Sequence, residues 1–286
     1  MKIKKRYIVL AVLAIGLFTT CHMEFMKFRQ SDAKTKTAFA EKGLPGVGFQ
    51  DYETAGQPMH FTVYGNDTLP LVVLVHGAPG SSSACLDYLM DTALTNHACV
   101  VALDRPGYGY SGFGKTERSL AKQAAAIKPI LEKYRRKKAV LVGHSFGGPV
   151  IARMAMDFPE LVDGLVIVAG SIDPALEPHY WWQHPLDWRA IRWMMPPAFR
   201  VANQEILPLP EELTDMLPRW KEITCPVTVV QGTKDNLVAP GNADFAERML
   251  TNSEKVEIIR MEGGSHFIFW SERGLIIQEI LKIINR

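Results

Sequence analysis

The chain has 286 residues, of which 47% are hydrophobic, enough for one globular domain of about 250 residues with a filled core. Lysine and arginine number 32 against 30 aspartate and glutamate residues. This balance, together with the lack of an aromatic-rich basic stripe, argues against nucleic acid as a partner.

The first residues have the layout of an export signal. Four basic side chains within residues 1–6 precede an almost wholly apolar run over residues 7–18. Positively charged residues that flank an apolar segment stay in the cytoplasm. The apolar run itself is shorter than the length that a membrane-spanning helix usually needs. We therefore expect residues 1–21 to be a signal sequence or membrane anchor. The rest of the chain would then lie outside the cytoplasm but associated with the membrane, in a bacterial periplasm or at the cell surface.

Two modes of membrane attachment remain open at the end of this segment. Cys21 resembles the lipid-modified cysteine of a bacterial lipoprotein, although Thr20 is larger than the glycine or alanine usual before it. The alternative is an uncleaved helical anchor that extends through Met26. Residues 22–44 are polar and rich in lysine, so we expect them to form a tether.

The domain that we expect over residues 45–286 opens with a hairpin and continues with alternating strands and helices. Residues 49–53 and 60–64 alternate between apolar and polar side chains, as hairpin strands do. The apolar run Leu71–Val75 predicts a buried strand, and the loop after it, residues 76–81, is rich in glycine and proline. Such a loop can direct a backbone N–H group, here that of Ala78, at a developing oxyanion.

A second loop follows the next predicted strand. Residues 104–111 contain two glycines and a proline, which is typical of a rigid turn at the rim of a site. We interpret Asp104 as a side chain that holds this loop by hydrogen bonds, with no part in chemistry.

The most informative stretch is residues 143–147, with the pattern Gly-x-Ser-x-Gly. It follows a short apolar run and precedes a predicted helix, and this strand–turn–helix context is typical of a nucleophile elbow. The small residues around Ser145 allow a tight, strained turn. We therefore predict that Ser145 is a nucleophile and that Phe146 supplies a backbone N–H group to the oxyanion. We interpret His144 as structural.

The alternation of strands and helices stops at about residues 171–223. This insert holds five of the six tryptophans and several prolines. An aromatic-rich insert predicts a largely apolar pocket, whereas the alternative is that the rings only pack the insert onto the core. Its short length indicates a few short helices.

The last two candidate catalytic side chains each follow one of the final two predicted strands. Asp235 lies in the loop after residues 227–230, and His266 lies in the loop after residues 256–261. His266 would act as general base toward Ser145, and Asp235 would accept the histidine Nδ1–H. Asp173 is the alternative acid, because it follows the preceding strand.

Together these segments resemble the α/β-hydrolase fold, in particular its serine-nucleophile, esterase- and lipase-like branch. The resemblance runs from about residue 45 to the C-terminus and implies a mostly parallel central sheet flanked by helices, with the insert as a short cap over the serine. The segments that carry it are His76-Gly77-Ala78-Pro79-Gly80, residues 104–111, residues 143–147, Gly232-Thr233-Lys234-Asp235 and Gly263-Gly264-Ser265-His266.

The expected function is hydrolysis of a small or medium carboxylic ester with an apolar acyl group, with no metal or organic cofactor. Because the nucleophile is serine, the resemblance disfavours haloalkane dehalogenases and epoxide hydrolases, which use aspartate there. One alternative is C–C bond or amide hydrolysis by the same triad. Peptidase relatives that favour N-terminal proline often use acidic residues of the cap to hold the substrate amine, and acids of this cap could do the same. Another alternative is a non-catalytic, membrane-tethered scaffold. The cap acids are Glu177, Asp187, Glu205, Glu211, Glu212 and Asp215.

Overall fold

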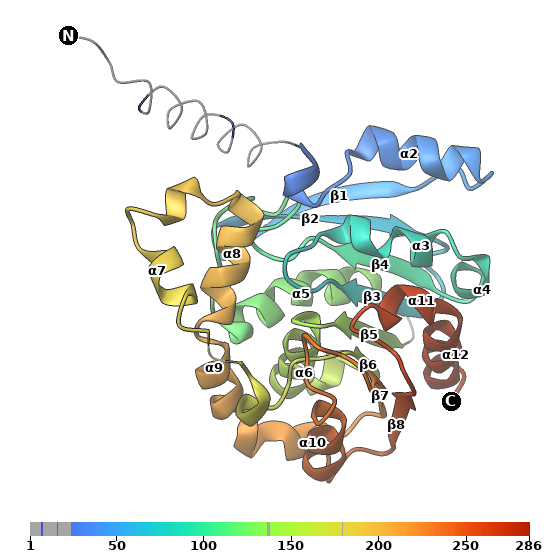
Figure 1. The fold of residues 1–286 in the computed structure, drawn as a ribbon. Helices are drawn as coiled ribbons and strands as arrows, with labels where there is room; N and C mark the ends of the chain where they lie inside the picture. Colours follow the sequence, from blue (N-terminus) through green and yellow to red (C-terminus); the bar gives the residue numbers. More distant parts are fainter. Residues whose placement is uncertain (1–6, 8–15, 17–23, 136–137, 179) are drawn as a thin grey trace.

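Eight strands form one sheet in the order β1-β2-β4-β3-β5-β6-β7-β8. The computed structural model describes Tyr7, Gly16 and residues 24–135, 138–178 and 180–286. Strands β1 and β2 form the antiparallel hairpin, β2 pairs antiparallel with β4, and all later pairs are parallel. Figure 1 shows this sheet running through the molecule. The strands are β1 (Gly48–Thr54), β2 (Gln57–Tyr64), β3 (Leu71–Val75), β4 (Cys99–Leu103), β5 (Ala139–His144), β6 (Gly164–Val168), β7 (Val227–Gly232) and β8 (Val256–Met261).

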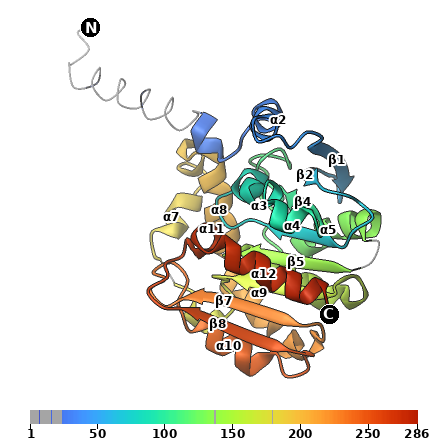
Figure 2. The ribbon, with the colours of Figure 1, turned by 90° about the vertical axis from the view of Figure 1, so that its right-hand side faces the viewer.

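Helices cover both faces of the sheet. One face packs against α5, α6 and α10, and the other packs against α3, α4 and α12. Figure 2 shows α12 lying along the near face. These helices are α3 (Leu86–Leu89), α4 (Thr92–Thr95), α5 (Leu120–Tyr134), α6 (Gly147–Asp157), α10 (Asn242–Met249) and α12 (Arg273–Ile284). Short elements beside them are α11 (Ile268–Ser271), η2 (Ser82–Cys85) and η3 (Pro159–Leu161).

The central strands are continuous apolar runs because both of their faces are covered. All five residues of β3 are fully buried, with Val73 and Val75 facing one layer of helices and Val72 and Leu74 facing the other. The predicted fold class, a mostly parallel sheet flanked by helices, is therefore confirmed. The parallel arrangement also brings the carboxyl ends of β3, β5, β7 and β8 to one edge, where the predicted site residues follow each strand.

The insert between β6 and β7 forms the cap that we expected. It contains short helices only, and α7, α8 and α9 lie together at the left of Figure 1. The elements are η4 (Pro174–Leu176), α7 (Gln183–Asp187), η5 (Arg192–Met194), α8 (Pro197–Ile206), α9 (Leu209–Met216) and η6 (Leu217–Glu222).

The N-terminal region differs from the expected tether. Residues 24–44 contain η1 (Glu24–Lys27) and α2 (Asp32–Glu41), and the Phe39 side chain of α2 is fully buried. Ser31 caps α2, and the Phe39 ring contacts Tyr64 edge-on at 5.1 Å between centroids. Because this segment is mostly polar and rich in lysine, its sequence did not indicate that the Phe39 side chain is buried. A tether is therefore the wrong description of residues 32–41.

The predicted signal or anchor, residues 1–21, lies outside the described residues except for Tyr7 and Gly16. Within the described parts of the chain, no helix combines the length and apolar character that crossing a membrane requires.

Candidate active site

Ser145 lies at the turn between β5 and α6, with a backbone φ of +54°. Its N–H donates to the Val168 carbonyl oxygen over 3.0 Å, and its own carbonyl accepts from the Gly148 N–H over 2.9 Å. A Cβ atom on Gly147 would lie 2.2 Å from the Val75 carbonyl oxygen, so only glycine fits below the turn. The turn therefore has the strained, glycine-dependent geometry that its sequence predicted.

His266 and Asp235 form a hydrogen-bonded pair. The His266 Nδ1 atom lies 2.8 Å from Asp235 Oδ2, and the Asp235 carboxylate is fully buried. Asp235 Oδ1 accepts from the N–H groups of Leu237 and Val238 over 2.9 and 2.8 Å. Burial raises the pKa of Asp235, but the bonds from His266, Val238 and Leu237 outweigh it and leave the pKa below its usual value. A charged Asp235 holds His266 with Nδ1 protonated and Nε2 available as a base.

Asp173, the alternative acid, has a different environment. Its Oδ1 accepts from the Ala175 N–H over 2.9 Å and caps η4, and its Oδ2 lies 3.9 Å from an Arg248 nitrogen. The carboxylate thus serves the start of a 3-10 helix. The structure brings Asp235, and not Asp173, to His266.

His144, beside the nucleophile in sequence, contacts the loop that carries His266. Its Nε2–H donates to the His266 carbonyl oxygen over 3.2 Å, and the two ring centroids are 4.9 Å apart. Burial, followed by the nearby His266, lowers the pKa of His144 to about 3. His144 therefore stays neutral and helps to position the His266 loop, in agreement with a structural role.

Two buried histidines, His144 and His76, make the free energy of unfolding depend on pH. His76 also has its pKa lowered to about 3, by burial and then by Arg105. Both folded-state values lie below the unfolded value of about 6.5, so the unfolded chain takes up protons first. The contribution of these two histidines to the free energy of unfolding is fully present above pH ~6.5. It is lost as the pH falls toward ~3, by at most about 1.4 kcal/mol per pH unit for each histidine.

The measurement is the free energy of unfolding of the wild type and of His144→Gln at pH values from ~4.5 to ~6.5. Glutamine can keep the donor to the His266 carbonyl without titrating. We expect a shallower pH dependence for the variant, by roughly 1 kcal/mol per pH unit. Parallel curves would show that protonation of His144 does not oppose folding.

The predicted oxyanion donors lie close to Ser145. Ala78 and Ser145 line the same cavity as Phe146, which directly precedes the first residue of α6. Across the described residues, the Ala78 and Phe146 N–H groups donate to no other protein group. Two unpaired N–H groups beside the serine, one of them at the start of a helix, suit a developing negative charge.

A buried ion pair supports the oxyanion loop from the cap. Arg105 donates to both Glu205 oxygens over 2.8 and 2.9 Å, and both side chains are fully buried. Arg105 also donates to the carbonyl oxygens of His76 and Gly77 over 2.8 and 3.0 Å, directly before Ala78. Tyr108 adds a hydrogen bond to Glu205 over 2.6 Å. In the sequence Glu205 resembles any other cap acid, so nothing there predicted this role.

Replacing Glu205 by alanine is expected to lower the free energy of unfolding by about 3–5 kcal/mol, because Arg105 would remain charged and buried without its partner. Urea denaturation measures this loss. The matched control is Glu132→Ala, which removes the exposed i, i+4 pair with Lys128 at 3.4 Å and should cost less than about 1 kcal/mol. Equal, small losses in the two variants would contradict a stabilising role for the buried pair.

Asp104 has the loop-holding contacts that we expected. Its carboxylate accepts from the N–H groups of Ser82 and Tyr110 over 2.6 and 2.8 Å and lies 3.1 Å from His60 Nδ1. Burial raises the pKa of Asp104, but these three partners outweigh it and lower the pKa below its usual value. All three contacts fix the loop, and Asp104 lines neither of the cavities at Ser145.

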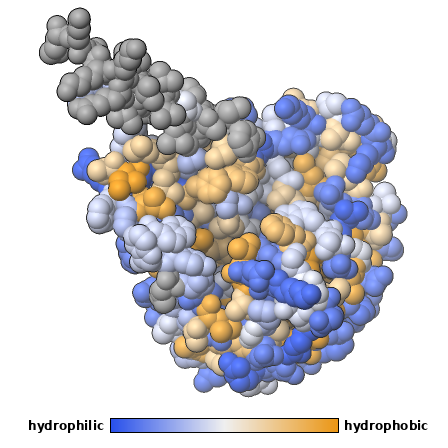
Figure 3. All heavy atoms as spheres, viewed as in Figure 1, coloured by the Kyte–Doolittle hydropathy of each residue, from blue (hydrophilic) through white to orange (hydrophobic). Residues whose placement is uncertain are grey.

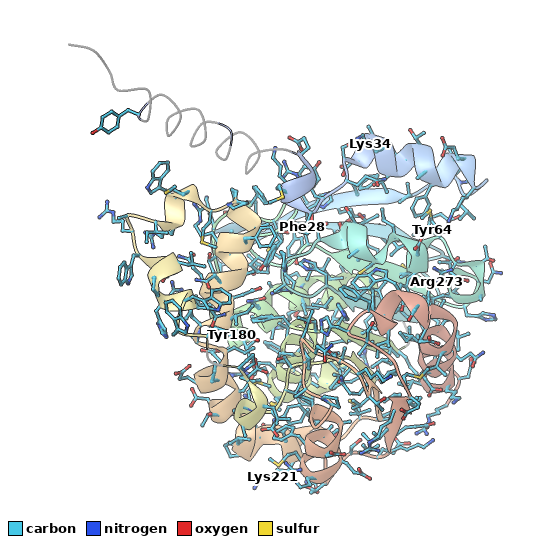
Figure 4. All side chains as sticks on the ribbon, viewed as in Figure 1. Phe28, Lys34, Tyr64, Tyr180, Lys221 and Arg273 are labelled. Atoms are coloured by element: carbon cyan, nitrogen blue, oxygen red, sulfur yellow. The ribbon has the colours of Figure 1, made fainter. Side chains whose placement is uncertain are left out.

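Two cavities meet at the serine. The first, of about 250 Å³, lies under the cap, and the second, of about 380 Å³, lies between the oxyanion loop and the residues after His266. Ala78, Ser145, Leu237 and His266 line both of them. Figure 4 labels Tyr180, which lines the first, toward the lower end of the cap, and Phe28, which lines the second, beside α8. The lining of the first cavity includes the polar side chains of Glu177, Gln183 and Ser171. The lining of the second is mainly apolar and aromatic.

The cap acids have different surroundings. Glu205 pairs with Arg105, Asp187 pairs with Arg118 over 2.9 Å, and Glu212 accepts from the Leu120 N–H over 2.7 Å. Glu177 lines the first cavity and accepts a hydrogen bond from Ser171 Oγ. Among the described residues, no group of three or more histidine, cysteine, aspartate or glutamate side chains is arranged to hold a metal ion.

Known proteins resemble this chain in sequence. The model of the alpha/beta hydrolase family matches residues 72–278. Epoxide hydrolase 4 from Mus musculus is 30% identical over 146 residues, which cover 49% of this chain and 40% of that protein. A 2-hydroxy-6-oxononadienedioate/2-hydroxy-6-oxononatrienedioate hydrolase from a Pseudomonas species is 33% identical over 103 residues, 35% of this chain and 36% of that protein. The chain thus matches less than half the length of these two curated relatives.

A solved structure resembles nearly the whole chain. A membrane phospholipase A, described as a novel bacterial virulence factor, superposes with a TM-score of 0.66 at 17% identity. The match covers 99% of this chain and 98% of that chain. At this level of identity the likeness shows the fold.

Proposed function

Because the chain belongs to the alpha/beta hydrolase family, we propose that it is a serine hydrolase that cleaves a small or medium carboxylic ester through an acyl-enzyme. The observation that carries the proposal is the arrangement around one cavity. Ser145 lines it together with His266, whose Nδ1 is 2.8 Å from the buried Asp235 carboxylate. This is the constellation of nucleophile, base and orienting acid that acyl transfer uses.

In the proposed mechanism, Ser145 Oγ attacks the ester carbonyl carbon while His266 Nε2 takes the hydroxyl proton. The negative charge develops on the carbonyl oxygen, where the Ala78 and Phe146 N–H groups stabilise it. The intermediate then collapses, and His266 gives the proton to the departing alcohol. A water molecule, deprotonated by His266, attacks the acyl-enzyme, and the acid leaves as the proton returns to Ser145.

Serine at the elbow also separates this proposal from the activity of the relative named as an epoxide hydrolase. Opening an epoxide through an alkyl-enzyme ester requires a carboxylate nucleophile, whereas a serine hydroxyl forms esters with acyl groups.

The test combines a covalent probe with a substrate screen. A fluorophosphonate probe should label the wild type at Ser145, and esters of graded acyl length should be hydrolysed faster than the matching amides. Failure of the probe to label the folded protein would favour the non-catalytic scaffold. A C–C bond hydrolase would label but leave every ester intact.

A second candidate function is hydrolysis of an amide or peptide whose substrate carries an amine. The Glu177 carboxylate in the wall of the first cavity favours it, since a carboxylate there can bind an ammonium group. Aminoacyl amides should then be hydrolysed faster than their N-acetylated counterparts, and Glu177→Gln should remove that preference.

We also propose that residues 1–21 attach the protein to a membrane, with the hydrolase domain outside the cytoplasm. The basic and apolar pattern of the sequence supports this. The intact mass of the membrane fraction distinguishes the modes of attachment. Cleavage before Cys21 with added acyl mass means a lipoprotein, and an unprocessed chain means a helical anchor. Full-length protein free in the cytosol would contradict both.

A further inference from the structure

The cap exposes large aromatic side chains. Trp181, Trp188 and Trp193 are 81%, 62% and 58% exposed. Exposed apolar surface often marks an interaction site, and tryptophan is enriched where proteins meet the interface of a bilayer. We call these three tryptophans, with Met194 and Phe199, the aromatic cap surface. Figure 3 shows several strongly hydrophobic residues on the upper part of the cap, next to paler ones, and a lower surface that is mostly hydrophilic.

The charge of the same segment is positive. From Tyr180 through Arg200 the chain has three arginines against one acid, Asp187. Arg118, in the loop before α5, pairs with that acid over 2.9 Å. Arg189 is exposed. A basic, tryptophan-rich surface complements anionic lipid headgroups better than it complements a neutral protein surface.

The N-terminal segment contacts this surface. η1 packs on α8, and the Phe28 ring after it contacts the Phe199 ring edge-on at 5.3 Å between centroids. The Phe28 carbonyl accepts from Ser81 Oγ over 2.5 Å, so the segment is also fixed to the oxyanion loop. Because the apolar sequence from Tyr7 and the candidate lipid site Cys21 lead directly into η1, either anchor brings the bilayer to this side of the molecule.

The second cavity borders both this surface, through Phe199, and the nucleophile. Phe28 and Phe199 line it together with Ser145 and His266. Phe267 and Trp270, which are 58% and 36% exposed, complete its aromatic wall. An apolar passage of this kind fits a hydrocarbon chain.

We propose that the aromatic cap surface docks on an anionic lipid bilayer and that the hydrocarbon chain of a lipid ester passes from the bilayer through the second cavity to Ser145. The docking step is independent of the chemistry, whereas the substrate class rests on the proposed ester hydrolase. The alternative occupant of the surface is a second copy of this chain.

Tryptophan fluorescence tests docking without catalysis. The full chain is reconstituted in phosphatidylcholine vesicles that contain phosphatidylglycerol brominated near the headgroup. Emission of the wild type should be strongly quenched, and the triple variant Trp181→Ser, Trp188→Ser, Trp193→Ser should lose most of this quenching. The matching triple replacement by phenylalanine keeps aromatic rings on the surface, so it should hydrolyse a long-chain ester in vesicles at the wild-type rate. Unquenched wild-type emission would overturn the proposal, and dimers that protect the same tryptophans would assign the surface to a second copy.

Activity tests the substrate class. In vesicles, the serine triple variant should hydrolyse a long-chain ester roughly tenfold more slowly, which corresponds to about 1.4 kcal/mol of docking free energy. Its hydrolysis of soluble p-nitrophenyl butyrate should stay within about twofold of wild type, a difference of less than 1 kcal/mol. Equal rates of vesicle hydrolysis in wild type and variant would overturn the proposal. A wild type that docks but hydrolyses neither ester would instead refute the proposed function.

A charge reversal supplies the matched control. Arg189→Glu changes the charge beside the aromatic cap surface by two units. Lys221→Glu makes the same change in η6, far from that surface at the lower end of the molecule, where Figure 4 labels Lys221. We expect the first to weaken quenching on anionic vesicles and the second to leave it unchanged. Equal effects would show that net charge, and not the cap surface, controls the interaction.

Discussion

Replacing Ser145 by alanine is expected to lower kcat for ester hydrolysis by about a million-fold, the order of loss seen when a triad serine is removed. The fold should persist, because the tight turn depends on the backbone and on the glycines around it. Alanine tolerates the left-handed conformation in this same protein, since Ala169 has a φ of +47° beside the elbow's +54°.

The measurement is kcat with a soluble ester, together with the melting temperature. Ser171→Ala is the matched control, because Ser171 lines the same first cavity and donates to Glu177. It should keep kcat within about tenfold of wild type, a difference of about 1.4 kcal/mol. If Ser145→Ala retains activity near wild type, Ser145 is not the nucleophile.

Replacing Asp235 by asparagine is expected to lower kcat by about ten-thousand-fold, as the corresponding change does in serine proteases. The reason lies in the contacts of the carboxylate. Leu237 and Val238 donate N–H groups to Oδ1, so an asparagine would place its oxygen there and direct its amide NH₂ at His266. Histidine Nδ1 would then have to accept, the proton would move to Nε2, and the base would be unavailable to Ser145.

Asp173→Asn is the comparison for this prediction. Asparagine can still accept from the Ala175 N–H, so the cap of η4 should persist and kcat should change little. Steady-state kinetics of the two variants decides between the acids. A larger loss in Asp173→Asn would mean that the assignment of Asp235 is wrong.

Local patterns in the sequence predicted the fold class and the positions of the candidate site. Apolar runs identified the buried strands, and parallel pairing then brought the residues after β3, β5, β7 and β8 to one edge. The predicted fold class and family are confirmed, whereas the catalytic roles of Ser145, Asp235 and His266 stay predictions with supporting geometry.

Contacts between distant segments were beyond such patterns. Arg105 and Glu205 are separated by a hundred residues. Each looks ordinary in its own loop or helix, and only the folded chain shows that they are paired. The same holds for α2, where one buried phenylalanine fixes an otherwise polar helix, and for Phe28, which reaches the second cavity from outside the expected domain.

The burial of Glu205 limits how the cap can be exchanged between relatives. A chimaera that carries a foreign cap without a carboxylate at this position would leave the Arg105 guanidinium charged in the core, at a cost of several kcal/mol. It would also release the His76 and Gly77 carbonyls that precede the oxyanion donor. The cap, which lines the substrate cavity, and the oxyanion loop therefore depend on the same ion pair. A grafted cap should give an active enzyme only when it has a carboxylate at position 205 to pair with Arg105.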